Sequence, residues 1–158
     1  MKKFIYLCSC ALLVSGLIAE ELKVKSDSFY ADQKKGFSVF TGHVNIIKGS
    51  DELNASKVTI YTDKNNQPTK FVSEGKSSFK IKTEDGSKYK GKAHKVVYLP
   101  NKKEYQFYKD VHLKQLNKKK EIIGEEVILN TIDGKAIAKG AENEPVIMIF
   151  NIEEKKEK

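Results

Sequence analysis

Residues that could perform acid–base, metal or nucleophilic chemistry are few in this chain, and they are scattered. The three histidines, His43, His94 and His112, stand singly in strand-like runs without the short spacing of a metal site. Both cysteines lie within the first nineteen residues. No G-x-S-x-G motif positions a serine nucleophile, and no Gly-rich phosphate loop precedes a helix. The sequence therefore predicts no catalytic residues, no metal site, no cofactor and no enzymatic activity.

Residues 1–19 have the layout of a secretory signal peptide. A short cationic start, "MKK", is followed by an uncharged apolar run from Phe4 to Ala19. We expect cleavage after Ala19, which removes Cys8 and Cys10 and leaves a mature chain without disulfides. The run is short for a membrane span. An uncleaved N-terminal anchor and a lipid-modified cysteine are the alternatives.

The charge of the mature chain comes from lysine alone. Without Lys2 and Lys3, 27 lysines face 21 acidic residues, so the net charge is +6, and the chain contains no arginine. Base-specific recognition of nucleic acid favours the planar fork of arginine, so we expect no nucleic-acid partner. A loosely anionic partner, such as a phosphorylated lipid or a membrane surface, is compatible with this charge. Taken alone, however, the charge is better explained by a simple solvated lysine-rich surface.

Hydrophobic residues alternate with polar ones along most of the mature chain. Period two is clear in "ASKVTIY" (55–61), "SSFKIKT" (77–83) and "DVHLKQL" (110–116), and clusters of Gly, Asn, Asp and Pro separate such runs. No window sustains a helical period. The sequence therefore predicts an all-β fold.

A weak repeat interrupts these strands near their middles. Gly42, Gly75, Asp110 and Gly140 mark similar points at intervals of 33, 35 and 30 residues. The runs between turns are about 13 residues long, whereas a typical strand has about 5–6. A glycine or aspartate halfway allows such a run to bulge and to cross from one sheet to its partner. We therefore expect a corner at each of the four positions.

The motif that carries a family resemblance is "GFSVFTGHVNIIKGSDELNASKVTIYTD" (36–63), followed by a second round over residues 72–98. It resembles the OstA-like family of lipopolysaccharide-transport proteins, whose pattern G-x-V-x-I, turn, L-x-A-x-x-V-x-I/L-Y is met by Gly42, Val44, Ile46, Leu53, Ala55, Val58, Ile60 and Tyr61. The resemblance implies an open-ended, twisted antiparallel β-jellyroll of two facing sheets. We assign it to residues 20–152 and expect residues 153–158 to be a disordered charged tail. Asp110 departs from the pattern, which leaves the strand count open.

Alternation directs one set of apolar residues into the space between the two sheets. These residues are Val44, Ile46, Val58, Ile60, Phe79, Ile81, Val96, Tyr98, Val111, Leu113, Val127 and Leu129. Any β-sandwich buries such a set in order to fold. The family resemblance implies that the same space binds the acyl chains of lipopolysaccharide.

Burial of hydrocarbon dominates the energetics expected for such a cargo. A chain of about a dozen carbons gains on the order of 10 kcal/mol at about 0.8 kcal/mol per CH₂, before ordering costs. An exposed lysine–phosphate contact contributes roughly 0–1 kcal/mol. Lys76, Lys80 and Lys82 are therefore expected to orient a headgroup at the rim rather than to provide affinity.

Strand-like segments lie at both ends of the predicted domain. They contain Leu22 and Val24 at one end, and Val146, Ile147, Met148, Ile149 and Phe150 at the other. An unpaired apolar edge can pair with another chain. The resemblance implies that these edges join copies head to tail, and join other lipopolysaccharide-transport (Lpt) proteins at the inner and outer membranes, by strand addition. Internal pairing of one end is the alternative.

Together with the signal peptide and the amphipathic strands, the family resemblance implies an exported periplasmic carrier that binds lipopolysaccharide and bridges the inner to the outer membrane. Two alternatives stay open. The domain could be a structural adaptor whose interior is only core. It could also be a membrane-anchored sister component that retains its N-terminal segment.

Overall fold

The computed structural model describes residues 20–152, so the predicted signal peptide (1–19) and the predicted tail (153–158) lie outside it. Ten strands and one short 3₁₀ turn fill this region: β1 (Leu22–Lys25), β2 (Ser28–Asp32), β3 (Phe37–Lys48), β4 (Asp51–Thr62), β5 (Pro68–Lys82), β6 (Lys88–Leu99), η1 (Pro100–Lys102), β7 (Glu104–Gln115), β8 (Lys120–Asn130), β9 (Ala136–Lys139) and β10 (Ile147–Phe150). Within the described region, no helix is long and apolar enough to cross a membrane. The predicted all-β fold is confirmed.

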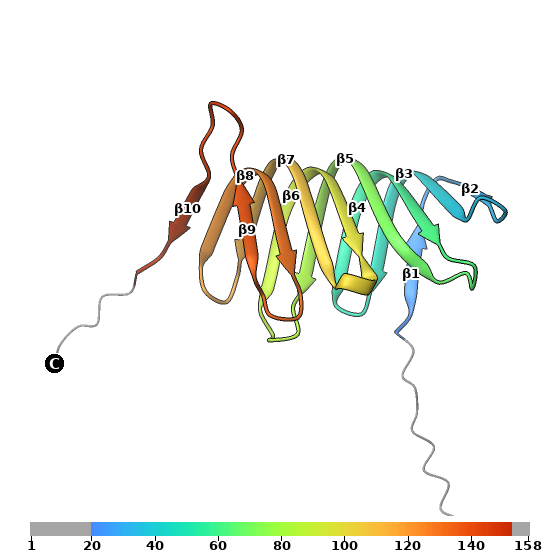
Figure 1. Cartoon of the computed structure of the whole chain (residues 1–158), viewed down its shortest axis with the longest axis horizontal. Coiled ribbons are helices and arrows are strands. Elements are labelled where there is room, and N and C mark those ends of the chain that lie inside the picture. Colours follow the sequence, from blue (N-terminus) through green and yellow to red (C-terminus); the bar gives the residue numbers. More distant parts are fainter. Residues whose placement is uncertain (1–19, 153–158) are drawn as a thin grey trace, which may run out of the picture.

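The strands form one continuous antiparallel ladder. Its order is β1-β3-β4-β5-β6-β7-β8-β10, while β2 also pairs with β3 and β9 also pairs with β8 (Figure 1). From β3 to β8, each strand pairs with the next strand along the chain. Short turns are therefore sufficient to build most of the sheet.

The long strands bend at bulges in their middles. The β3–β4 register shifts between Thr41 and Val44, and comparable shifts interrupt β5 and β7. The bulges contain left-handed residues: Gly42 (φ 80°) and His43 (φ 45°), Gly75 (φ 79°) and Lys76 (φ 46°), and Lys109 (φ 66°) and Asp110 (φ 50°). Left-handed backbone is costly for residues with a Cβ and free for glycine. The corners predicted at Gly42, Gly75 and Asp110 are thus confirmed.

The corner predicted at Gly140 is wrong. Gly140 follows the short strand β9, and its φ is not left-handed. A Cβ atom at this position would lie 2.1 Å from the carbonyl oxygen of Glu144. Glycine is required here because the chain folds back closely on itself before β10, and not because a strand crosses between sheets.

The bends divide the ladder into two facing layers. The first half of β3 pairs with β2, and its second half pairs with β1. In β8 the second half pairs with β9 and the first half with β10. We call the two halves the β2–β9 layer and the β1–β10 layer. The two facing sheets predicted from sequence are therefore two halves of one bent sheet, with β1 and β2 at one end and β9 and β10 at the other (Figure 1).

The core between the layers consists of two clusters. The smaller one contains Val44, Ile46, Ala55, Val58 and Ile60, and the larger one includes Phe79, Phe107, Leu113 and Leu129. Of the twelve residues predicted to face inward, all are buried except Tyr98, which is half-buried. The rings of Phe79 and Phe107 stack across the two layers with centroids 4.3 Å apart. Strand alternation therefore predicted the inward face correctly.

Candidate functional site

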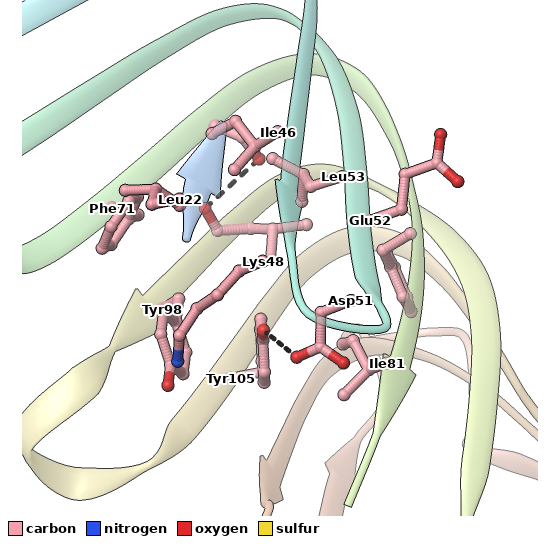
Figure 2. A pocket seen from close by; sticks show the side chains of 13 residues that line it. Leu22, Ile46, Lys48, Asp51, Glu52, Leu53, Phe71, Ile81, Tyr98 and Tyr105 are labelled. Atoms are coloured by element: carbon pink, nitrogen blue, oxygen red, sulfur yellow. Dashed lines mark hydrogen bonds between the residues drawn. The ribbon is translucent and has the colours of Figure 1, made fainter. Parts of the chain in front are cut away.

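A small apolar cavity lies between the layers, where the two core clusters meet. Its volume is about 50 Å³, which is room for a few water-sized molecules. Leu53 packs against both clusters and forms part of its wall (Figure 2). The β1–β10 layer contributes Leu22, Ile46, Phe79 and Ile81, and the β2–β9 layer contributes Phe71, Ser73, Val96, Tyr98 and Tyr105. Because the cavity is this small, a hydrocarbon chain can enter only if the layers separate.

The lining residue Ser73 has a hydroxyl group that pairs with the hydroxyl group of Ser77. Ser73 Oγ and Ser77 Oγ lie 2.9 Å apart, and Ser73 also donates to the carbonyl of Val96 at 3.3 Å. Ser73 and Ser77 are both buried. Since these polar atoms satisfy one another, they impose no unpaired-group penalty beside the apolar wall.

Polar side chains from both layers meet at the mouth of the cavity. Tyr105 Oη, from β7, donates to Asp51 Oδ2, from β4, at 3.1 Å. The backbone N–H of Lys82 donates to Asp51 Oδ1 at 2.9 Å. Nearby, Lys48 Nζ lies 5.7 Å from the ring centroid of Tyr98. Figure 2 shows the Asp51–Tyr105 hydrogen bond and the position of Lys48 beside Tyr98, together with Glu52, whose carboxylate points away from the cavity.

Two titratable side chains at this mouth, Asp51 and Tyr105, are partly removed from solvent. Burial raises the pKa of the Asp51 carboxyl above its ordinary value of 3.8, although hydrogen bonds from Lys82 and Tyr105 act in the opposite direction. Burial, reinforced by the charge of Asp51, also raises the pKa of Tyr105 well above its ordinary value. Tyr105 therefore keeps its proton at neutral pH and remains a hydrogen-bond donor to Asp51.

A second group of contacts joins the layers further along the same side. The N–H of Glu84, in the turn after β5, donates to the carbonyl of Thr131, which follows β8, at 2.8 Å. The side chains of Lys103 and Glu84 form an ion pair. We call these contacts, together with Asp51–Tyr105, the latch. All of them join turns or strand ends rather than continuous strands.

The three lysines predicted to form a headgroup rim lie in different places. Lys82 lines the polar mouth. Lys80 lies on the outer face of the sheet, 3.3 Å from Glu52, and Lys76 lies in the β5 bulge. The structure instead brings Lys48 and Lys103 to the mouth. Lys48 could have been predicted from the sequence because it continues the inward alternation of Val44 and Ile46. Lys103 lies in a turn between strands, and no sequence pattern there indicates that it would reach the mouth.

The histidines remain separate from one another. His43 lies 2.7 Å from Asp27, His94 lies 2.9 Å from Asp110, and His112 lies 2.7 Å from Glu121. Among residues 20–152, no group of three or more histidine, cysteine or acidic residues could hold a metal ion.

A second apolar hollow opens between the layers near the C-terminal end. It has a volume of about 170 Å³. Tyr89, Leu113 and Ile122 line it from central strands, and Met148 of β10 and Ala136 of β9 line it from the end of the sheet. Apolar surface between the layers is thus accessible near β10 as well as at the mouth.

The predicted assembly residues lie at the two ends of the β1–β10 layer. Leu22 and Val24 belong to β1, residues 147–150 form β10, and Val146 directly precedes it. Each of these strands pairs on one side, β1 with β3 and β10 with β8. Within residues 20–152, the other edge of each strand is unpaired. The β10 side chains are about half exposed, from 43% at Ile149 to 51% at Phe150.

Comparison with known proteins identifies the family. The family model described as "LptA/(LptD N-terminal domain) LPS transport protein" matches residues 23–135. The chain belongs to this family. The family resemblance inferred from the strand pattern is therefore confirmed, and the family is defined by transport rather than by a catalysed reaction.

A solved structure shows the same fold as this member of the family. It is the crystal structure of LptH from Pseudomonas aeruginosa, described as the LptA homologous periplasmic component of the conserved lipopolysaccharide transport device. The TM-score is 0.75 at 21% identity, and the match covers 84% of this chain and 96% of that chain. No curated protein matches the chain.

Proposed function

We propose that this protein is a non-enzymatic carrier in lipopolysaccharide transport that accommodates acyl chains between its two layers. The observation that supports the proposal best is the apolar cavity between the two core clusters, whose mouth is closed by the latch and by Lys48 over the ring of Tyr98. Along the opposite side, the strands run unbroken from one layer to the other through the bulges. The layers can therefore part at the mouth and pivot at the bulges.

The energetics favour such an opening when cargo is present. Each hydrogen bond of the latch contributes about 0.5–1.5 kcal/mol net. A buried chain of about a dozen carbons gains on the order of 10 kcal/mol before ordering costs. One acyl chain can therefore offset the loss of the few contacts that hold the mouth closed, including Asp51–Tyr105.

Photo-crosslinking from adjacent residues on opposite faces tests this proposal. Phe71 lines the cavity, and its neighbour Val72 lies on the opposite face of the same layer. Tyr98 and Val97 form a second such pair, in which Val97 is 9% exposed. We expect benzoylphenylalanine at position 71 or 98 to capture lipopolysaccharide, and the same probe at position 72 or 97 to capture little. Equal capture from both faces would show that the cargo does not enter between the layers.

Export to the periplasm is also part of the proposal. It is supported by the predicted signal peptide and by membership of a family whose relative LptH is described as periplasmic. N-terminal sequencing of the exported protein tests it, and a start at Glu20 is expected. A retained Met1 would instead favour the membrane-anchored sister component.

Head-to-tail assembly through the ends of the β1–β10 layer completes the proposed function. The unpaired edges of β1 and β10 support it, because strand addition needs a free edge on each partner. The same mode would join the protein to other Lpt proteins at the two membranes. The substitution Ile149→Lys should weaken concentration-dependent association in sedimentation velocity, whereas Ile132→Lys, at a similarly exposed turn position, should not.

The adaptor alternative is tested by the same edge variant. If the interior is only core, Ile149→Lys will abolish assembly, and no probe at position 71 or 98 will capture cargo. If the protein is a carrier, the monomeric variant will still be labelled from these positions.

A further inference from the structure

The outer face of the β1–β10 layer carries lysines at directly opposed positions. Lys80 lies opposite Lys90, and Lys90 lies opposite Lys114, in the β5–β6–β7 part of the ladder. One row further along, Lys82 lies opposite Lys88. We call the set the basic face; it comprises Lys80, Lys82, Lys88, Lys90, Lys92 and Lys114.

This arrangement leaves positive charge uncompensated. Like charges directly opposite each other in a sheet are destabilising. Acidic side chains flank the row only at its ends, where Glu52 lies 3.3 Å from Lys80 and Glu121 lies 3.1 Å from Lys114. In the part of the chain that the structure describes, no acidic side chain forms an ion pair with Lys90 or Lys92. An external anion would relieve this repulsion.

The outer face of the β2–β9 layer shows that a lysine-rich composition does not force such an arrangement. There Lys57 lies opposite Glu74, and Glu74 lies opposite Lys95. At the far end, Glu126 lies opposite Lys139. The pairs Lys57–Glu74 and Lys139–Glu126 are separated by 3.7 and 3.8 Å. On this face the charges alternate in sign across neighbouring strands.

The basic face also contains a hollow. It measures about 510 Å³ and is bordered by Lys80, Lys90, Lys92 and Lys114, with Ser78, Gly91 and His112 among its other lining residues. Neighbouring strands are about 4.8 Å apart, and successive outward positions along a strand are about 6.6 Å apart. Lysines on this grid are mobile point charges. They suit a fluid array of phosphate groups better than one rigid planar ligand.

We propose that the basic face docks the protein on an anionic lipid surface, with a headgroup phosphate in the hollow between Lys90 and Lys92. The proposal does not require acyl chains to enter between the layers, because the basic face lies on the outside of the β1–β10 layer. Its failure and the failure of the carrier proposal are therefore separable.

Vesicle co-sedimentation of the exported protein tests the proposal. The probes are vesicles of phosphatidylcholine alone and of phosphatidylcholine with phosphatidylglycerol. The test variant carries Lys90→Gln, Lys92→Gln and Lys114→Gln. A matched control carries Lys57→Gln, Lys70→Gln and Lys95→Gln, which lie in the β2–β9 layer and remove the same charge. Thermal unfolding verifies that both variants fold.

We expect the unmodified protein to bind only the phosphatidylglycerol vesicles and to bind them less at higher salt. Each lysine near such a surface changes the partition coefficient roughly fivefold, so the test variant should lose on the order of 100-fold, and the control should stay within about fivefold. Equal losses in the two variants would overturn the proposal, because net charge alone would then explain binding. Absence of vesicle binding would also overturn it. The proposal would also be overturned if inorganic phosphate released more protein from the vesicles than chloride does at the same ionic strength. The ligand of the basic face would then be free phosphate.

Discussion

The two long sides of the bent sheet differ in how they hold the layers together. On the bulged side, β3, β5 and β7 pass from one layer to the other as continuous chain, through residues such as Gly42 and Gly75. On the mouth side, strand ends and turns are joined by the latch, through contacts such as Asp51–Tyr105, and by Lys48 over the ring of Tyr98. We therefore expect the bulged side to act as a fixed hinge, and the mouth side to be the side that opens.

The largest effect is expected from a change on the hinge side. Gly75 has a φ of 79°, and a Cβ there would lie 2.8 Å from Ser56 Oγ. Gly75→Val should lower the free energy of unfolding by about 3 kcal/mol, because a β-branched residue is strained in this conformation. Urea denaturation measures the change. Ser78→Val, three residues along the same strand on an outward position, serves as the control and should change stability by less than about 0.5 kcal/mol.

Removal of the central latch contact should have the next largest effect. Asp51→Ala leaves the Tyr105 hydroxyl and the Lys82 N–H without their acceptor. We expect a loss of about 2 kcal/mol in the free energy of unfolding, mainly from the cost of leaving the buried Tyr105 hydroxyl unsatisfied. The exposed Glu142→Ala provides a control without this cost. A loss as large as that of Gly75→Val would mean that the two sides hold the layers equally firmly.

The pH dependence of the free energy of unfolding tests the contribution of the Asp51 carboxyl group. Its pKa is raised in the folded protein, so the folded state binds more protons than the unfolded state between pH 3.8 and the raised value. The contribution of this group is therefore greatest at low pH and declines as the pH rises through that window. Asp51→Asn should remove this decline from the urea-denaturation profile measured at a series of pH values. A mutant profile parallel to that of the unmodified protein would contradict the assignment.

The smallest effect is expected at the exposed end of the latch. The Lys103–Glu84 ion pair is accessible to solvent, and such pairs contribute little to stability. Lys103→Gln should leave the urea midpoint unchanged within error, as should the neighbouring control Lys102→Gln. If Lys103→Gln proved as damaging as Asp51→Ala, the side-chain pair would be a principal link between the layers.

Local pattern was sufficient to predict the all-β class, the inward face and the bends, because their determinants are local, whereas the open-ended jellyroll came from the family resemblance. Alternation gave the inward direction of residues such as Val58 and Leu129, and Gly42, Gly75 and Asp110 marked the bends. The same rule failed at Gly140. A glycine required for close backbone approach to Glu144 looks the same in sequence as one required for a left-handed φ.

The latch could not be predicted in this way. Asp51 and Tyr105 are 54 residues apart and lie in different layers, so their contact depends on how the bent halves face each other. The alternation of strand residues predicts an inward direction for Lys48, whereas its charge argues against one. The structure resolves the conflict, because the ammonium group of Lys48 lies over the ring of Tyr98. The basic face was missed for a related reason. The composition gives only the number of lysines. The register of β5, β6 and β7 determines whether a given lysine lies opposite an acidic residue or opposite another lysine.

The bend occurs at an equivalent point in strand after strand, so the molecule has a nearly constant cross-section along its length. Insertion of one more hairpin of this kind would lengthen the body by about 9.6 Å, two strand spacings, without altering its profile. The reach of such a protein is then set by a simple count of hairpins, and longer or shorter versions need no redesign of their interior.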